Sequence, residues 1–516
     1  MPFGGVLLDS TQTTGIIDIG SNTVRLAVFR LSAGGARRIV DQGRWAARLS
    51  RRLLPDGRLP DEAVAELTEV LHHYLRICRM HGTQRIRAVA TAAVRAASNR
   101  EDVIRRLHET TGLRIEVLTG EEEAHYGSQA MLRTLGVADG YVVDIGGGST
   151  EITLLRGRKK EGAVSFPVGS VNMSSLYGLE DEPVPASALE GIERDVNRLL
   201  ASKKWLSSHP GLPLIGLGGT ARAFAKFRQR ETDYPFPQVH GFEQSDAELS
   251  SALDKLAGMT VAARRKLPGL SKDRADVIVP GLAILKAVMR HTGSTRLAVC
   301  GTGIRDGLFF ETSLPKVEEN RENPVLEESI RNLTALYPTA PQEHLEQVRA
   351  LACAVLDRLN EDQTLPGRAK VWLDAAARLY KIGAAIDLND CADHTFYMLM
   401  HTHLYGLPHR EILLTAGIAS FRGLNALKRN LNPYRSMLED EDFDSIARLG
   451  SILQLAAALD RSESQSIRNL HAEAGRGKLV LTAEAQHSLS MERMEVDSLA
   501  KDFKKIWGLT PVLHVR

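Results

Sequence analysis

Two segments of this chain repeat one another, and this repeat limits the fold more than any other feature. The segments are IIDIGSNTVRLAVFR (residues 16–30) and VVDIGGGSTEITLLR (residues 142–156), which align without a gap at an offset of 126 residues, from Asp18 to Asp144. Each has an apolar, β-rich run, an Asp-Ile-Gly sequence with a small polar turn, and a second alternating run, which is typical of a β-hairpin. The repeat therefore predicts a duplicated domain in which each half begins with a hairpin.

The turn of each hairpin has the composition of an anion-binding site. Glycine and small polar residues let several backbone N–H groups point into one concavity, and hydroxyl groups add further donors. Neither turn matches the G-x-x-x-x-G-K-[ST] phosphate loop or leads into a helix, as a dinucleotide fingerprint does. We expect each turn to bind phosphate; a turn that only closes its hairpin is the simpler alternative. The expected phosphate-binding residues are Gly20, Ser21 and Asn22 in the first turn, and Gly146, Gly147, Gly148, Ser149 and Thr150 in the second.

An aspartate stands at the end of the first apolar run in each repeat. A carboxylate is rare in such a position unless it is hydrogen-bonded or holds a cation. Mg²⁺ prefers a few carboxylates together with water and substrate phosphates. We therefore predict that Asp18 and Asp144 organise Mg²⁺ beside the two turns. The alternative is that each carboxylate caps its own turn.

Two later segments repeat the pattern of a strand followed by a glycine turn. In PLIGLGGTARAFAKF (residues 213–227), a helix follows the turn, so Gly218, Gly219 and Thr220 are expected to hold a phosphate at the helix N-terminus. RLAVCGTGIRDGLFFE (residues 296–311) is similar, although its glycines serve equally well for packing.

Composition excludes several classes of protein. The chain has 516 residues, with 65 Lys and Arg against 63 Asp and Glu, and the net charge of +2 gives no general reason to expect DNA or a membrane as a partner. Its four cysteines are far apart and form no C-x-x-C pair, which favours a reducing compartment over a disulfide framework or a zinc cluster. The N-terminus lacks the regions of a signal peptide, and no run approaches the roughly 18 apolar residues of a membrane span. The expectation is a soluble, cytoplasmic protein of several domains.

Seven motifs in order resemble the exopolyphosphatase/guanosine pentaphosphate phosphohydrolase (Ppx/GppA) family. They span about residues 15–311 and are DIGSNTVRL (18–26), ATAAVRAASN (90–99), LTGEEEAHYG (118–127), DIGGGSTEI (144–152), SFPVGSVNM (165–173), GLGGTARA (216–223) and LSKDRADVIVPG (270–281). The resemblance implies an α/β fold, namely the duplicated actin-like (ribonuclease H-like) ATPase fold shared with sugar kinases and heat-shock chaperones. It also implies a phosphate chain bound between the two halves, with its terminal phosphoryl group released to water.

The resemblance assigns roles to three further residues. The family's catalytic base is the first Glu of a Glu-Glu-Ala motif, which here is Glu122, although Glu121 precedes the pair and leaves room for an error of one position. Arg95 lies where the family has a phosphate-binding arginine, and Glu151 lies where it has an acidic residue near the metal. Without the resemblance, a solvated helix start would be the preferred interpretation of the three glutamates.

A different architecture is expected after residue 312. SLPKVEENRENP (residues 313–324) has the composition of a linker, and apolar residues then recur at helical spacing. IRNLHAEAGRGKLVLTAE (residues 467–484) predicts a hairpin, followed by a helix at 494–507 and a short strand at 511–515. The expected parts are 1–128 and 129–312 for the two halves, 325–465 for a helical domain, and 466–516 for a small α+β unit.

The helical part resembles the metal-dependent HD phosphohydrolases, as longer family members do, but it departs from their metal motif. Tyr380 and Lys381 occupy the positions of the His-Asp pair, and neither replaces an imidazole or a carboxylate as a ligand. Nearby histidines suggest a metal, but no Asp-His pair completes a site, so we predict no second active site. The histidines are His394, His401, His403 and His409.

The resemblance favours an exopolyphosphatase that uses Mg²⁺, with inorganic polyphosphate as substrate and a homodimer as the expected assembly. A guanosine pentaphosphate 5′-phosphatase is the alternative within the family. A protein that binds polyphosphate or the alarmone without turnover, and an ATP-dependent kinase of the same superfold, are alternatives from other classes. Neither DNA nor a membrane is an expected partner.

Overall fold

The computed structural model describes residues 11–179, 183–315 and 323–516. The chain forms two compact units: the first contains Met1–Tyr234 and Gln238–Val325, and the second contains Pro235–Pro237 and Leu326–Arg516. Most of the expected linker at 313–324 lies outside the described residues, because 316–322 are not among them.

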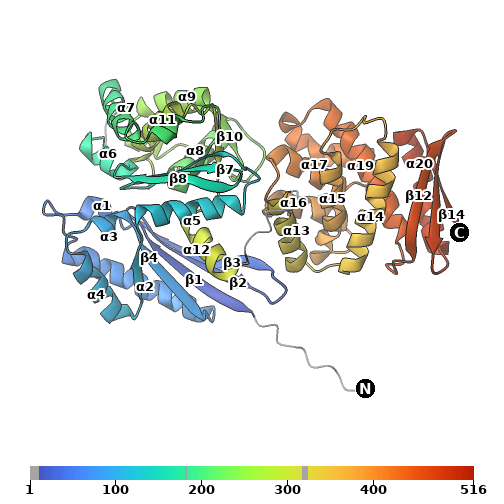
Figure 1. Cartoon of the computed structure of the whole chain (residues 1–516), viewed down its shortest axis with the longest axis horizontal. Coiled ribbons are helices and arrows are strands. Elements are labelled where there is room, and N and C mark those ends of the chain that lie inside the picture. Colours follow the sequence, from blue (N-terminus) through green and yellow to red (C-terminus); the bar gives the residue numbers. More distant parts are fainter. Residues whose placement is uncertain (1–10, 180–182, 316–322) are drawn as a thin grey trace, which may run out of the picture. The chain divides into compact units, whose positions relative to one another are not determined.

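The first unit begins with a five-stranded sheet in the order β3-β2-β1-β4-β5 (Figure 1). β1, β2 and β3 are antiparallel, whereas β4 and β5 run parallel to β1. The strands are β1 Gln12–Ile19, β2 Val24–Leu31, β3 Arg37–Trp45, β4 Arg85–Ala90 and β5 Ile115–Val117. The helices of this part are α1 Leu49–Arg52, α2 Asp61–Met80, α3 Ala92–Ala96, α4 Arg100–Thr111 and α5 Gly120–Leu132.

A six-stranded sheet follows in the order β10-β11-β9-β6-β7-β8. Its strands are β6 Gly140–Ile145, β7 Thr150–Arg156, β8 Lys159–Phe166, β9 Leu214–Leu217, β10 Glu243–Ser245 and β11 Arg296–Val299. Its helices are α6 Ser170–Leu176, α7 Ala186–Leu200, α8 Gly218–Glu231, α9 Asp246–Ala257, α10 Val261–Arg264, α11 Ile278–Thr292 and α12 Ile304–Ser313, with a 3₁₀ turn η1 at Lys204–Ser207.

The two sheets have the same topology, apart from the extra edge strand β10. In each, an antiparallel meander of three strands (β1–β3, β6–β8) is followed by two strands that pair parallel to the first strand of the meander and to each other (β4 and β5, β9 and β11). Both repeated segments form the predicted hairpins, so the sequence repeat corresponds to a duplication of the fold.

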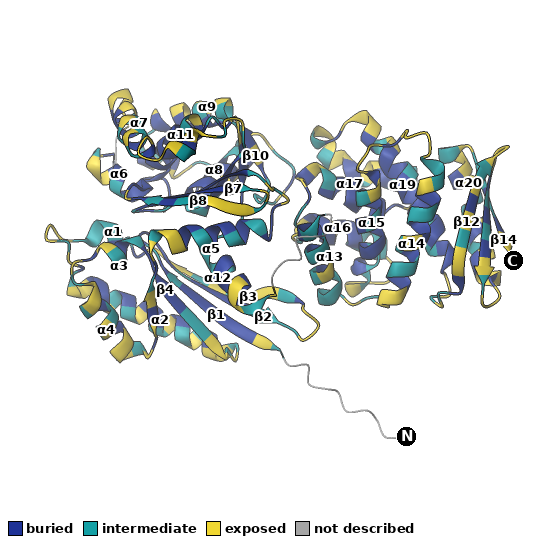
Figure 2. Ribbon diagram, in the orientation of Figure 1, coloured by how far each residue is buried: buried dark blue, intermediate teal, exposed yellow. Residues whose placement is uncertain are grey.

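Apolar side chains pack on both faces of the sheets, and Figure 2 shows central strands such as β1 as largely buried, whereas the edge strands β3 and β8 are more exposed. In the first sheet, α2 and α4 supply one core, around residues such as Leu67 and Leu107. In the second sheet, α7, α9 and α11 pack over the corresponding face, around residues such as Ile192 and Leu285.

Two helices tie the halves together. α5, which follows the first sheet in sequence, packs against β7 and β8 of the second, and α12, which follows the second sheet, packs against α5 and β1 (Figure 1). The rings of Phe29 on β2 and Phe309 on α12 stack with their centroids 4.1 Å apart. α5 therefore lies between the second sheet and α12, which in turn packs against the first sheet.

The second unit consists of helices and a three-stranded sheet. Its helices are α13 Pro324–Leu336, whose first two residues belong to the first unit, α14 Gln342–Leu359, α15 Ala369–Leu379, α16 Cys391–His401, α17 His409–Ala419, α18 Leu424–Leu431 and α19 Asp440–Leu459, with 3₁₀ turns η2 Ile382–Ala385 and η3 Asn432–Met437. The predicted C-terminal hairpin is confirmed as β12 Ile467–Gly475 and β13 Lys478–Ala485, followed by α20 Ser490–Trp507 and β14 Thr510–Val515, which pairs parallel with β13.

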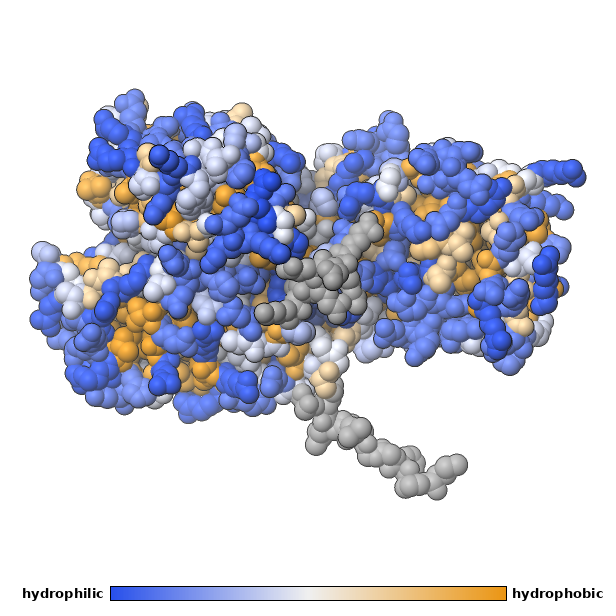
Figure 3. Space-filling view, viewed as in Figure 1, coloured by the Kyte–Doolittle hydropathy of each residue, from blue (hydrophilic) through white to orange (hydrophobic). Residues whose placement is uncertain are grey.

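Figure 3 shows a face that is mainly hydrophilic, with scattered apolar patches. Among the described residues, none of the helices has the length and apolar character needed to cross a membrane.

Gly307 on α12 tests the contact between α5 and α12. Gly→Ala inside a helix usually stabilises a protein by about 0.5–1 kcal/mol. A Cβ at Gly307, however, would lie 2.0 Å from the carbonyl oxygen of Tyr126 on α5. We therefore expect Gly307→Ala to lower the free energy of unfolding of the first unit by about 1–3 kcal/mol in urea denaturation, as overpacked substitutions do.

Gly127→Ala on α5 is the matched control, because its Cβ would meet only the flexible end of Leu217, at 3.2 Å. The control should change stability less than Gly307→Ala does. A Gly307→Ala protein as stable as the wild type would contradict this account of the packing.

Candidate active site

The two hairpins bring their aspartates to the same cavity. Asp18 on β1 pairs in register with Arg25 on β2, and at the equivalent positions Asp144 on β6 pairs with Glu151 on β7. All four residues line one cavity of about 110 Å³ in the first unit. The duplicated hairpins therefore present an Asp twice, with an arginine opposite the first and a glutamate opposite the second.

Helix α6 orients the peptide groups of the second turn. The N–H groups of Ser170 and Val171 donate to the carbonyl oxygens of Gly146 and Gly147, both at 2.9 Å, and the Asn172 amide donates to the Gly148 carbonyl at 3.2 Å. In a trans peptide the next N–H points opposite to the carbonyl. Within the described part of the chain, no backbone acceptor takes the N–H groups of residues 147–149. Three donors therefore face away from α6, as an anion site requires.

The N-terminus of α8 meets the second aspartate. Gly218 has a φ of +76°, and a Cβ there would lie 2.0 Å from Asp144 Oδ1. Only glycine combines this backbone conformation with so close an approach. Gly218 and Gly219 line the cavity, so the positive end of the α8 dipole contributes to it.

Arginine side chains gather around the same cavity from four separate segments. They are Arg25, Arg222, Arg274 and Arg305, of which Arg274 is buried and the others half-buried. Burial and the neighbouring guanidinium groups lower the pKa of Arg25 to about 9. Burial, and then Arg44, lower the pKa of Arg274 to about 10. Such mutual repulsion between cations is relieved when a polyanion enters the cavity.

The two aspartates are held in an environment that disfavours their charge. Burial raises the pKa of Asp18, opposed mainly by Arg25, and burial also raises the pKa of Asp144, opposed mainly by Arg222. Asp18 Oδ1 is buried and has no hydrogen-bond partner among the described residues. A buried carboxylate oxygen without a hydrogen-bond donor is suited to bind a cation.

A second acidic pair lies where α5 meets β7. Glu123 is 6% exposed, forms an ion pair with Arg95 and lines the cavity. Burial and the nearby Glu151 raise the pKa of Glu123, and burial and Asp144 raise that of Glu151. Glu151 accepts a hydrogen bond from Ser165 Oγ at 2.7 Å. These two carboxyl groups share one low-dielectric site, so one of them is well placed to carry a proton.

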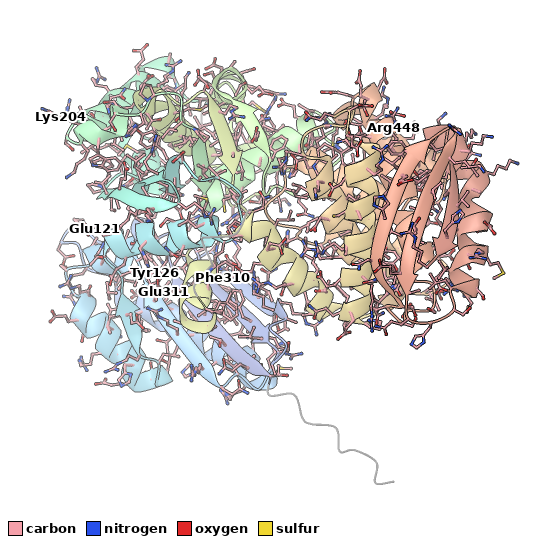
Figure 4. The ribbon with its side chains drawn as sticks, turned by 45° about the vertical axis from the view of Figure 1, so that its right-hand side comes forward. Glu121, Tyr126, Lys204, Phe310, Glu311 and Arg448 are labelled. Atoms are coloured by element: carbon pink, nitrogen blue, oxygen red, sulfur yellow. The ribbon has the colours of Figure 1, made fainter. Side chains whose placement is uncertain are left out.

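Glu122, the residue expected to be the base, does not line the cavity. Its carboxylate accepts hydrogen bonds from Thr119 N at 2.8 Å and Thr119 Oγ1 at 3.0 Å, and this capping box begins α5. These hydrogen bonds lower the pKa of Glu122. Figure 4 places the neighbouring Glu121 at the beginning of the same helix. Glu123 is the member of the triplet that faces the cavity.

The other expected residues divide into two groups. Those lining the cavity are Asp18, Gly20, Ser21, Asn22, Asp144, Gly146, Gly147, Ser149, Glu151, Gly218 and Gly219. Arg95, Gly148, Thr150 and Thr220 do not line it. Three of them hold its neighbours: Arg95 binds Glu123 and the Leu118 carbonyl, while the Thr150 and Thr220 hydroxyls donate to the carbonyls of Val168 and Ile145 at 2.6 and 3.4 Å.

The four cavity arginines were not among the expected site residues. Each of them lies within a few residues of a glycine turn or in a motif that carries the family resemblance, as in GSNTVR, GGTAR, LSKDR and GTGIR. A search for arginines close behind glycine turns would have found three of the four.

Two family models match the chain. The model described as the Ppx/GppA phosphatase family covers residues 27–316, which is more than half of the sequence. The chain belongs to the Ppx/GppA phosphatase family. A second model, Ppx/GppA phosphatase domain III, matches residues 325–502. The two similar sheets of this Ppx/GppA protein have the expected actin-like ATPase fold, and the helical domain III and the small C-terminal sheet follow them.

Relatives of this Ppx/GppA protein include one curated protein and several solved structures. An uncharacterized protein from Streptomyces coelicolor is 32% identical over 308 residues, which cover 58% of this chain and 89% of that protein. The crystal structure of the Aquifex aeolicus Ppx/GppA family member is 26% identical, with a TM-score of 0.52, and covers 60% of this chain and 100% of its own. An exopolyphosphatase from Cytophaga hutchinsonii shares the fold with a TM-score of 0.55 at 21% identity, over 59% of this chain and 99% of its own.

Glu151→Gln tests the electrostatic description of the site. Because the pKa of Glu151 is raised above the ordinary 4.5, the folded state binds its proton more tightly than the unfolded chain does. The free energy of unfolding of the wild type therefore falls as the pH rises above about 4.5. Glu151→Gln has no carboxyl group at this position and lacks this loss. In metal-free buffer at pH 8, Glu151→Gln should be more stable than the wild type by on the order of 1–3 kcal/mol.

This difference should shrink as the pH falls toward 5, when stability is measured by urea denaturation across the pH range. Glu62→Gln on the exposed start of α2 is the control, and at pH 8 its stability should stay within about 0.5 kcal/mol of the wild type, as for most surface substitutions. A Glu151→Gln protein less stable than the wild type at pH 8 would show that the carboxylate is stabilised by its surroundings.

Proposed function

We propose that this protein is an exopolyphosphatase that releases the terminal orthophosphate of inorganic polyphosphate by attack of water. The observation that carries the proposal is the composition of the cavity. Four arginines and two turns rich in N–H donors surround a space of about 110 Å³, and the described lining residues include no aromatic ring. Guanidinium groups and backbone N–H groups are the usual ligands of phosphate. Pockets for drug-sized organic ligands occupy about 300–1,000 Å³, so this cavity suits phosphoryl groups and offers no stacking surface for a nucleobase.

Magnesium fits the carboxylates at the base of the cavity. Asp18, with its unpartnered Oδ1, and Asp144 would hold the ion. Among the described residues, no group of three His, Cys, Asp or Glu side chains is arranged to bind a metal, so phosphate and water oxygens would have to complete the coordination. This is the manner in which Mg²⁺ usually binds. Bound there, it would supply positive charge to the phosphate oxygens as their negative charge increases.

Glu123 is the residue we propose as the general base, in place of Glu122. Its buried carboxyl group lines the cavity and is positioned by Arg95, whereas the Glu122 carboxylate is occupied by Thr119. Burial raises the pKa of Glu123 and so strengthens it as a base, while the ion pair with Arg95 opposes this shift and favours the ionised form that a base requires. In the proposed step, water oxygen bonds to the terminal phosphorus, the bridging P–O bond breaks, and the water proton passes to Glu123.

Phosphate release from three substrates tests the proposed function. Long-chain polyphosphate, tripolyphosphate and guanosine pentaphosphate are compared at equal phosphate concentration, with and without Mg²⁺. We expect orthophosphate from both inorganic chains in the presence of Mg²⁺, and much slower release from the nucleotide. Faster turnover of guanosine pentaphosphate than of polyphosphate would contradict the assignment.

Glu123→Gln and Glu122→Gln identify the base. Loss of a general base lowers turnover by about 10²–10⁴-fold, so Glu123→Gln should reduce kcat by that factor with little change in substrate binding. Glu122→Gln keeps most of the capping interaction and should change kcat by less than about threefold, since it removes no group from the cavity. The reverse pattern, with Glu122→Gln inactive and Glu123→Gln active, would restore Glu122 as the base.

A further inference from the structure

A second cavity, of about 320 Å³, lies within the helical part of the second unit. Its lining comes from the start of α14, the end of α15, α17, α19 and α20, and therefore from segments that are far apart in the sequence. Its volume is within the range of pockets that bind small organic molecules.

The floor of this second cavity is a chain of hydrogen-bonded side chains. His344 and Asp460 are almost fully buried, and His344 Nδ1 lies 2.7 Å from Asp460 Oδ2. On its other side, His344 Nε2 lies 2.6 Å from the hydroxyl oxygen of Tyr380. The carboxylate of Asp460 also accepts hydrogen bonds from Gln465. Tyr380 lines the second cavity, and the buried His344–Asp460 pair sets the orientation of its hydroxyl group.

The ammonium group of Lys381 makes the second cavity a poor site for a metal ion. Lys381 lines the second cavity beside Tyr380 and forms an ion pair with Glu463. Its positive charge lines the same cavity as His344 and Asp460 and opposes the binding of another cation there. The second cavity therefore favours a molecular ligand over a metal ion.

The walls of the second cavity are apolar. Ile418, Phe421 and Leu453 line it and are all buried. Such a surface favours a hydrocarbon or aromatic body on the ligand, because burial of apolar area contributes about 25 cal/mol per Å².

Charges of both signs stand at the mouth of the second cavity. Lys381 pairs with Glu463, and Arg461 pairs with Glu495 at 3.3 Å; these side chains are 25–56% exposed. The two cations would repel a ligand with only a positive charge. The two carboxylates would repel a ligand with only a negative charge. A zwitterion satisfies both signs at once, with its carboxylate on the cations and its ammonium group on the carboxylates.

One neutral polar group faces the space between walls and mouth. In the described part of the chain, the half-buried Gln454 amide makes no hydrogen bond, although it lines the second cavity. It offers a donor and an acceptor, and the Tyr380 oxygen retains a free lone pair. A single polar atom on an otherwise apolar side chain would find a partner here.

We propose that the second cavity binds a free α-amino acid with a large, mainly apolar side chain, of the tyrosine or tryptophan type. The ammonium and carboxylate groups lie at the mouth, against the two ion pairs, and the ring lies along Ile418, Phe421 and Leu453. The polar atom of the side chain reaches Gln454 or Tyr380. This inference is independent of the phosphate site, and it gives the helical domain a ligand of its own.

Isothermal titration calorimetry on the full chain tests the proposal with defined probes. L-Tryptophan and L-tyrosine are compared with tryptamine, which lacks the carboxylate, and indole-3-propionate, which lacks the ammonium group. We expect both amino acids to bind, and each analogue to bind at least about tenfold more weakly, because a lost charge-assisted hydrogen bond costs about that factor or more. This comparison uses only the wild-type protein.

Variants then locate the site. Lys381→Gln and Glu495→Gln should each weaken L-tryptophan binding by about tenfold or more. Lys370→Gln is the matched control, because its ion pair with Asp357 lies away from the second cavity, and binding should be unchanged. The absence of binding by both amino acids at millimolar concentration, equal binding of tryptamine, or full binding by both cavity variants would overturn the proposal.

Discussion

The mutual repulsion of arginines around one small cavity is the constraint on which the first unit depends. Arg25, Arg222, Arg274 and Arg305 come from four distant segments, and burial and their proximity lower the pKa of Arg25, Arg222 and Arg274. Such a cluster persists only when the surrounding fold holds it in place. α5 and α12, which link the two sheets, supply part of that framework. The half-buried Asp18 and Asp144 attract Arg25 and Arg222 and oppose part of the repulsion.

Duplication placed two copies of one hairpin at the same cavity, and the two copies contribute different side chains. Asp18 and Asp144 occupy equivalent positions, so the two halves present their carboxylates to the same space. The residues paired with them differ, since Arg25 adds positive charge in one half and Glu151 adds a carboxyl group in the other. The symmetric backbone thus supports an asymmetric cavity, with arginine side chains on it and an acidic pair, Glu123 and Glu151, where α5 meets β7.

Local patterns predicted much of this fold, and long-range contacts account for what they missed. The hairpins, the strand-glycine-helix segments and the C-terminal hairpin depend on residues close in sequence. They could therefore be predicted from the sequence alone. The arginine cluster depends on four segments that only the tertiary structure brings together. The choice between Glu122 and Glu123 depends on which side of α5 faces the cavity, and a triplet of identical residues does not reveal it. Likewise, His344 and Asp460 are 116 residues apart and meet only in the folded helical domain.

The most direct test of the account is the fate of the attacking oxygen when polyphosphate is hydrolysed in water labelled with ¹⁸O. Attack by water on the terminal phosphorus places a single labelled oxygen in each released orthophosphate and none in the shortened chain, and mass spectrometry measures both. This is the result that the account predicts. Labelled oxygen in the remaining chain, or orthophosphate without the label, would show that the cavity carries out a different reaction.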